Sequence, residues 1–155
     1  MKSKLLLLLD TESDSTSLIA RTALAVTMLP HGAQKTLGWF GGYGFDATMQ
    51  WFTQTMGIPW VLALAAVLAE SVGALALLAG AASRVTAAGI GAVYLVAFFS
   101  SHLQHGFFMN WSGTQSGEGI EYFLLGLALV AIVVWRGGGA ASIDRALAAR
   151  LVAAR

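Results

Sequence analysis

The chain has 155 residues, of which 57% are hydrophobic and 11% charged, whereas a soluble domain carries about 25% charged residues. With a mean hydropathy of +0.70, this composition excludes an ordinary soluble protein and indicates one membrane domain. The net charge of +1 without a basic, aromatic-rich patch argues against nucleic-acid binding, and the lack of cysteine excludes disulfides, iron–sulfur ligation and a cysteine nucleophile.

Residues 1–17 form a polar leader before the first long apolar stretch. Their start, MKSKLLLLLD, resembles a signal peptide. The leucine run is too short for the apolar region of such a peptide, and Asp10, Glu12 and Asp14 follow it at once. We therefore expect an interfacial or disordered leader that is not cleaved.

Four apolar stretches have about the length of a membrane-spanning helix, at residues 18–37, 60–80, 85–106 and 118–135. Between the first two, apolar residues recur at helical spacing over 46–56, which predicts a short interfacial helix. The predicted fold is all-α, an integral membrane four-helix antiparallel bundle over residues 18–136. In the tail, residues 137–155, Ser142 is expected to cap a final helix.

The distribution of Lys and Arg predicts the orientation. Apart from Lys35, within the end of the first stretch, these residues lie near both ends of the chain and, as Arg84, in the tight turn between the second and third stretches. The first and third connections have none. By the positive-inside rule, both termini and the Arg84 turn are cytoplasmic. Arg21 and Arg84 then mark the inner boundary, with an Arg84–Asp144 ion pair as an alternative role for Arg84.

Glu70 lies at the centre of the apolar stretch 60–80 and therefore near the bilayer midplane. A carboxylate there is costly unless it is paired, hydrogen-bonded or protonated, so it is a functional candidate by default. The alternative is a structural carboxylate that hydrogen-bonds the third or fourth span.

Further ionisable residues fall at the outer ends of three predicted spans. They are His31, Lys35, His102, His105, Glu118 and Glu121. We predict that His31, Lys35, His102 and Glu121 converge on one outward-opening polar pocket with Glu70 as its floor. As alternatives, Lys35 snorkels to the interface, His102 hydrogen-bonds a neighbouring helix, and His105 and Glu118 are ordinary boundary residues.

The three histidines raise the question of a metal or a b-type haem, because imidazoles on two helices can ligate either. His102 and His105 are three residues apart on one predicted helix and His31 is on another, with no fixed metal-binding spacing. The sequence therefore predicts no metal site and does not favour haem.

Several segments in order along the chain resemble the DoxX family of membrane proteins. They are HGAQKTLGWFGGYG at 31–44, ESVGALALLAGAASR at 70–84, HGFFMNW at 105–111, GEGIEYFLL at 117–125 and GGGAASID at 137–144. The resemblance implies a four-helix membrane protein. The family takes its name from small subunits of a thiosulfate:quinone oxidoreductase, and its relatives are associated with quinone or catechol detoxification and with membrane redox complexes.

The matching positions implicate a set of residues. They are His31, Lys35, Glu70, Arg84, Asn110, Glu121 and Asp144. We expect a protein of the bacterial inner membrane that binds a quinone or a similar small aromatic molecule. Glu70, Glu121 and His31 would relay protons, whereas Lys35, His102, His105 and Asn110 would contact the ligand, and Arg84 and Asp144 would be structural.

No redox centre is evident in the sequence, so a soluble or membrane redox partner or a bound cofactor would supply the electrons. A non-catalytic accessory or scaffold subunit of a membrane oxidoreductase is the first alternative function. A pathway for a small solute or for protons is the second.

Overall fold

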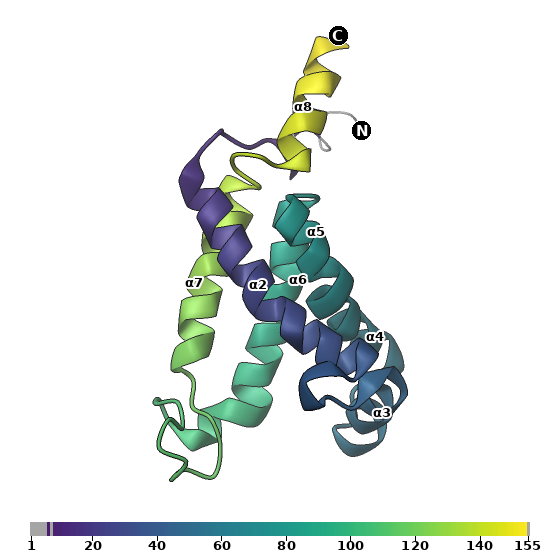
Figure 1. The fold of residues 1–155 in the computed structure, drawn as a ribbon, viewed down its shortest axis with the longest axis vertical. Helices are drawn as coiled ribbons and strands as arrows, with labels where there is room; N and C mark the ends of the chain where they lie inside the picture. The colour runs from purple at the N-terminus through teal and green to yellow at the C-terminus, as the bar shows by residue number, and fades with distance from the viewer. Residues whose placement is uncertain (1–5, 7, 155) are drawn as a thin grey trace.

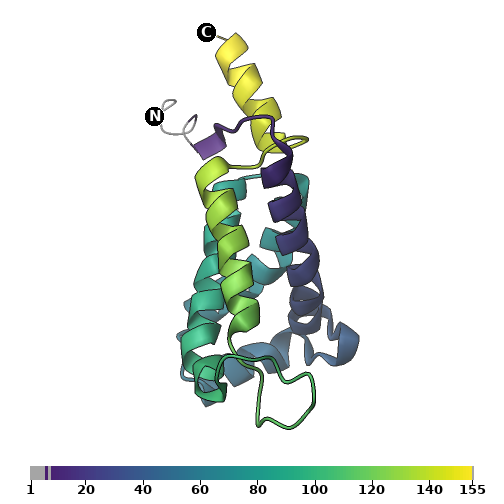
Figure 2. The ribbon, with the colours of Figure 1, turned by 90° about the vertical axis from the view of Figure 1, so that its left-hand side faces the viewer.

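A computed structural model of the chain describes residue 6 and residues 8–154, and the regular secondary structure within these residues is entirely helical. The all-α part of the prediction is therefore confirmed. Long helices run side by side and reverse direction from one to the next along the chain (Figures 1 and 2).

Helix α2 (Ser15–Leu37) is the first long element, and its ends explain its length. The Asp14 carboxylate caps it by accepting a hydrogen bond of 2.9 Å from the backbone N–H of Ser17. The helix ends at Gly38, whose φ of 72° suits glycine because it lacks a Cβ atom. The helix thus begins within the predicted leader, three residues before the predicted first span.

The first connection folds into the short helix that the sequence predicts. After the 3₁₀ turn η1 (Trp39–Gly41), helix α3 (Gly44–Gln50) continues into the π-helical turn η2 (Trp51–Thr55). The chain reverses here through residues with positive φ, including Phe40 at 53°. This unit lies beside the C-terminal part of α2 and closes one end of the molecule (Figure 1).

The second and third long helices each contain a π-helical turn. Helix α4 (Trp60–Leu68) passes through η3 (Ala69–Gly73) into α5 (Ala74–Ala79). After a turn at Gly80, α6 (Ser83–Ala97) continues through η4 (Phe98–His102) and the 3₁₀ turn η5 (Leu103–His105). Such turns interrupt the regular hydrogen-bond pattern and are frequent at functional sites.

The last two helices are α7 (Glu121–Arg136) and α8 (Ile143–Ala153). The hydroxyl of Ser142 accepts a hydrogen bond of 3.2 Å from the backbone N–H of Arg145, which confirms the predicted cap of the final helix. Helix α8 extends away from the other helices (Figures 1 and 2). We call this end of the molecule the α8 end, and the opposite end, with α3 and residues 106–120, the loop end.

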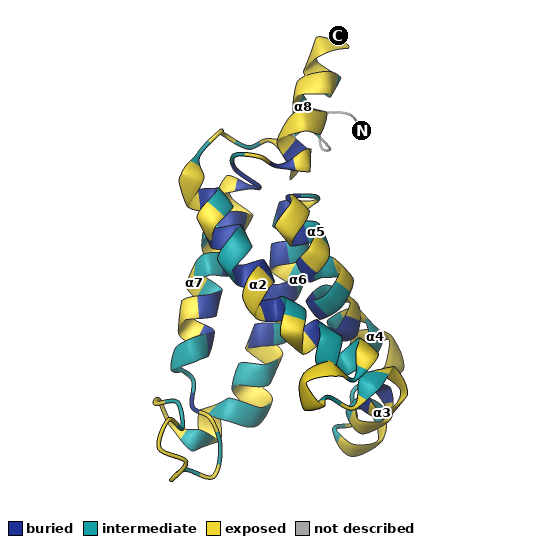
Figure 3. Cartoon of the chain, viewed as in Figure 1, coloured by how far each residue is buried: buried dark blue, intermediate teal, exposed yellow. Residues whose placement is uncertain are grey.

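The core lies where α2 meets α5 and α7, and where α6 meets α7. Its fully buried apolar side chains include Leu24, Leu77, Ile90 and Val133. Many large apolar side chains on the outward faces are exposed instead (Figure 3), which suits a lipid surrounding and would be unfavourable in water.

Two helical segments are long and apolar enough to cross a membrane, Trp60–Ala79 and Ser83–His105. These correspond to the predicted spans 60–80 and 85–106. The other two predicted spans do not meet this criterion: α7 has only 16 residues, and α2, although it has 23, is not apolar enough on average. The structure therefore supports an all-helical protein with two membrane-length helices.

Candidate functional site

A buried ion pair joins α2 to the π-helical turn η3. Glu70 is 5% exposed, and its Oε2 atom pairs with the Nζ atom of Lys35, which lies in the last turn of α2. Within the described residues, Oε2 accepts no further hydrogen bond. Lys35 is therefore the cation that compensates the buried carboxylate, and the chemical role of both residues stays a prediction.

Close packing of α2 on η3 brings this pair together. A Cβ atom added at Gly32 would lie only 2.3 Å from the carbonyl oxygen of Glu70 and 2.7 Å from the Cα atom of Ser71. Only glycine permits such an approach. Because Gly32 and Lys35 are three residues apart, they share a helix face, and the Lys35 side chain is directed to the turn that carries Glu70.

Lys35 also lines a cavity of about 520 Å³ at the loop end. The remaining walls come from α2, the glycine-rich connection and the α3–η2 unit. They are formed by Gln34, Gly41, Gly42, Tyr43, Ala47, Thr48, Trp51 and Phe52. The walls are mainly apolar and aromatic, with few polar residues besides Lys35, which is the usual character of a small-molecule site.

The glycine-rich connection is fixed against α2 at this cavity. The Gln34 side-chain amide donates a hydrogen bond of 3.2 Å to the carbonyl oxygen of Phe40. A Cβ atom at Gly42 would lie 2.3 Å from the carbonyl oxygen of Gln34, so the two backbones are in close contact. The wall of the cavity is thus built by contacts that a hydropathy pattern does not reveal.

His31 lies one turn before Lys35 on α2 and is exposed. It belongs to the same side of the molecule as the ion pair, as the four-residue spacing predicts. Its place leaves it open to the surroundings of the protein rather than enclosed in the cavity.

The other predicted site residues are engaged within the third connection. Glu121 Oε1 accepts hydrogen bonds from the Met109 backbone N–H at 2.9 Å and from the Trp111 indole N–H at 3.3 Å. His102 Nδ1 lies 2.9 Å from the carbonyl oxygen of Glu118. These contacts fold residues 106–120 back onto the start of α7.

The same connection contains two more predicted residues. Asn110 and Gln115 exchange two hydrogen bonds, and the Asn110 backbone N–H donates to Glu118 Oε2 at 2.6 Å. His105 Nδ1 lies 3.1 Å from the Ser116 hydroxyl. In the described part of the chain, no hydrogen bond or ion pair connects this group to Lys35 or Glu70, so the structure places the predicted residues in two groups.

Tyr94 and Tyr122 are polar residues of the core that the sequence analysis did not single out. Their hydroxyls are 3.0 Å apart across the α6–α7 contact, and Tyr94 is only 3% exposed. Gly126 leaves room for the Tyr94 ring, since a Cβ atom there would lie 2.3 Å from it. The sequence feature that could have indicated this contact is the presence of one tyrosine on each of two neighbouring apolar helices.

At the α8 end, Arg84 and Asp144 contact backbone groups and not each other. The Asp144 carboxylate, 1% exposed, accepts hydrogen bonds from the N–H groups of Ala82 and Ser83 at 2.6 and 2.7 Å. The Arg84 guanidinium donates to the carbonyl oxygens of Val134, Trp135 and Asp10. The alternative of an Arg84–Asp144 ion pair is therefore wrong.

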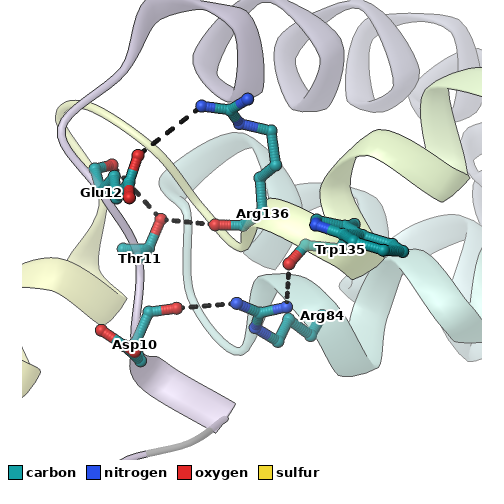
Figure 4. A pocket seen from close by; sticks show the side chains of 6 residues that line it. All are labelled: Asp10, Thr11, Glu12, Arg84, Trp135 and Arg136. Atoms are coloured by element: carbon teal, nitrogen blue, oxygen red, sulfur yellow. Dashed lines mark hydrogen bonds and ion pairs between the residues drawn. The ribbon is translucent and has the colours of Figure 1, made fainter.

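Arg84 also borders a second cavity, of about 270 Å³, between the segment 10–12 and the end of α7 (Figure 4). Its lining is polar, and the charges are largely paired: Arg136 lies 3.7 Å from a Glu12 carboxylate oxygen and 3.3 Å from one of Asp14. Thr11 donates a hydrogen bond of 3.0 Å to the carbonyl oxygen of Arg136. The cavity thus lies between the end of α7 and a leader segment that hydrogen bonds and ion pairs hold in place.

Arg21 has a larger structural role than a boundary charge. It is 2% exposed and donates hydrogen bonds to backbone carbonyls at the end of α5 and in the segment before α8. The acceptors are Leu77, Leu78, Gly138, Ala140 and Ala141. One guanidinium therefore satisfies several carbonyl groups that the helix end and the turn leave free.

Among the described residues there is no group of three or more His, Asp or Glu side chains that could hold a metal ion. The site consists instead of a buried ion pair, an aromatic-lined cavity and an exposed histidine. Such groups can bind a small molecule, donate a hydrogen bond to its oxygen atoms and exchange protons with it.

The DoxX family model matches residues 16–103. This range includes nearly all of α2, the α3–η2 unit, the first membrane-length helix and nearly all of the second, and therefore the ion pair and the cavity beside it. Comparison with curated proteins and with solved structures gave no match. Because the model covers more than half of the chain, the protein belongs to the DoxX family of membrane proteins.

Proposed function

We propose that this chain is a redox-associated protein of the bacterial inner membrane, which binds a quinone or a similar small aromatic molecule beside Lys35. The observation that carries this proposal is that Lys35, whose ammonium pairs with Glu70, is one of the residues that line an aromatic-lined cavity. A quinone needs an apolar slot for its ring and a donor for its carbonyl oxygens. Trp51, Phe52 and Tyr43 offer the first, and Lys35 offers the second.

The roles follow from the positions of the side chains. Lys35 would donate a hydrogen bond to a quinone oxygen and stabilise the negative charge that develops there on reduction. Glu70 and the exposed His31 would exchange protons with the site. Electrons would come from a redox partner, and His102, His105, Asn110 and Glu121 would shape the third connection, away from the ligand.

In the proposed membrane arrangement, α2 and α7 cross the bilayer together with the two membrane-length helices, as an antiparallel four-helix bundle. Exposed Val61, Val72, Leu75 and Leu125 would then face lipid. The α8 end, with Arg84, Arg136 and Arg145, would be cytoplasmic. Reporter fusions at Ser112 and at the C-terminus should report opposite sides, and a common side would contradict this topology.

Ligand binding is tested by thermal unfolding of the purified protein in detergent with a series of quinones. A ligand at 100 times its Kd should stabilise the protein by about 2.7 kcal/mol. Lys35→Ala should reduce that stabilisation because the ligand oxygen loses its donor. Gln50→Ala, an exposed change on nearby α3 outside the cavity wall, is the matched control and should keep it.

One observation favours the accessory-subunit alternative. Helix α8 stands clear of the other helices (Figure 2), with Ile143, Leu147 and Val152 exposed. A protein subunit docked on α8 would cover these side chains. If no quinone stabilises the parent protein, this second candidate becomes the better one.

A further inference from the structure

Lys35 serves two parts of the site at once. Its ammonium compensates the buried Glu70 carboxylate, and Lys35 is also one of the residues that line the cavity. Glu70 Oε2 accepts no other hydrogen bond within the described residues. A ligand that engages Lys35 therefore acts on the one cation that holds the Glu70 charge.

The other ionisable groups around the pair do not replace this cation. On α2, His31 is within electrostatic range of both Lys35 and Glu70, but no hydrogen bond or ion pair joins it to either within the described residues. On α6, the Tyr94 hydroxyl is within electrostatic range of Glu70, but it is a neutral group that is already hydrogen-bonded to Tyr122. In the cavity wall, Tyr43 is the titratable side chain besides Lys35, and it is 85% exposed.

The consequence depends on the charge of the ligand. A neutral carbonyl oxygen accepts a hydrogen bond from Lys35 and leaves the Lys35–Glu70 pair intact. A negatively charged oxygen instead competes with Glu70 for the ammonium. The site would then hold two negative charges against one positive charge, and a buried carboxylate without its cation is strongly disfavoured.

We propose that binding of a ligand with an anionic oxygen, such as a phenolate, is coupled to the uptake of one proton by Glu70. This inference rests on the proposed function of the cavity. The proton, taken from water, converts the Glu70 carboxylate into a neutral carboxylic acid, and Lys35 pairs with the ligand oxygen. The buried site is then neutral overall both before and after binding.

Two probes with the same ring system test the coupling. 1,4-Naphthoquinone is neutral, whereas 2-hydroxy-1,4-naphthoquinone is an anion at neutral pH. Calorimetric titration of each into the detergent-solubilised full chain, in buffers with different ionisation enthalpies, gives the number of protons taken up per ligand bound. The expected values are close to one for the anion and close to zero for the neutral quinone.

Two variants identify the proton acceptor. In Glu70→Gln, Lys35 has no competing carboxylate, so the anion should bind at least as tightly as in the parent but without proton uptake. Asp46→Asn removes an exposed carboxylate on α3 and should keep the parental uptake. If a variant folds poorly, the proton uptake of the parent protein with the two probes still tests the coupling.

The possible failures are distinct. If the anion binds the parent without proton uptake, or if Glu70→Gln keeps the uptake, the coupling at Glu70 is wrong while the ligand site stands. If neither probe binds the parent protein, the proposed function fails and the coupling fails with it.

Discussion

Arg21 and Lys35 are two cations on the same helix, α2, at opposite ends of the molecule. Arg21, at the α8 end, donates hydrogen bonds to backbone carbonyls from all three of its guanidinium nitrogens. Lys35, at the loop end, has one carboxylate partner and borders an apolar cavity. The first arrangement is what a structural role requires, and the second leaves a charged group available to a ligand.

The same difference extends to the acidic residues. Asp144 and Glu70 are both buried, but Asp144 accepts two backbone N–H groups at the start of α6, whereas Glu70 depends on one side chain. Backbone N–H groups at a helix start are fixed in place and stay with their carboxylate when a ligand binds elsewhere. A carboxylate held by one side chain can lose its partner and change its protonation state.

The largest expected effect is at the α8 end. Arg21→Ala should lower the free energy of unfolding by more than about 3 kcal/mol, because several buried carbonyls lose their donor at once, each at a cost of ~1–3 kcal/mol. Arg21→Lys should also destabilise, since an ammonium cannot reproduce the planar fork of the guanidinium. Thermal unfolding in detergent measures both.

Arg145→Ala is the control for these variants. Arg145 is exposed and donates a hydrogen bond of 2.6 Å to the Ser13 hydroxyl, so its loss should change stability by less than about 0.5 kcal/mol. Equal effects of Arg21→Ala and Arg145→Ala would mean that Arg21 does not hold the α8 end together.

The next effect separates stability from binding at the loop end. Lys35→Met leaves Glu70 buried without its cation and should lower the free energy of unfolding by about 2 kcal/mol. This is less than the cost of breaking a fully buried ion pair, because the Lys35 side chain is 22% exposed. The double variant Lys35→Met with Glu70→Leu should recover most of that loss, since no unpaired charge remains. Thermal unfolding of both singles and the double gives the coupling.

Quinone-dependent stabilisation should be absent from the double variant even though its fold is restored. Full stabilisation by quinones in that variant would show that the pair is not part of a ligand site. No single compensating change should rescue the loss of Arg21. In that outcome, however, the α8 end and the loop end would no longer differ in having a structural cation and a ligand-binding cation.

The sequence predicted the helices better than it predicted the site. Apolar length located the helical stretches within a few residues, and Ser142 revealed the last cap, because burial pattern and capping are local properties of the chain. Arg21 was interpreted only as a boundary charge, since nothing local indicates that the segment before α8 returns to it. Its role depends on a contact between the two ends of the chain.

The predicted pocket illustrates the same limit. Depth along the predicted spans placed His31, Lys35, His102 and Glu121 toward one end, but depth does not specify which residues meet. Glu121 is hydrogen-bonded to Met109 and Trp111 within its own connection. Lys35 faces η3 because Gly32 allows α2 to approach it, and a hydropathy pattern does not encode such a close backbone contact.

Gly32→Ala tests that approach with an intermediate effect. The added methyl group would lie 2.3 Å from the Glu70 carbonyl oxygen, so α2 and η3 must separate, at about 1–3 kcal/mol. Gly89→Ala is the matched helical control: its Cβ atom would lie 3.7 Å from that of Ala69, an ordinary contact. Of these two variants, only Gly32→Ala should have lower thermal stability and weaker quinone binding. A Gly32→Ala variant with parental stability and binding would contradict the close packing.

The smallest expected effect concerns the pH dependence of the α8 end. The hydrogen bond from the Ser17 N–H, followed by the charge of Arg136, holds the pKa of the Asp14 carboxyl below its usual value, which is about 3.9 in an unfolded chain. Because the folded state favours the carboxylate, this stabilisation is complete above that value and is lost as the pH falls through the lower pKa of the folded protein.

Asp14→Ser keeps a helix cap without an ionisable group, so its stability should decline less steeply than that of the parent between about pH 5 and pH 2. The measurement is the unfolding midpoint of both proteins across that range in one detergent. Parallel curves would indicate that the Asp14 cap contributes nothing through its charge, and the α8 end would then depend on Arg21 and Asp144 for its electrostatic stabilisation.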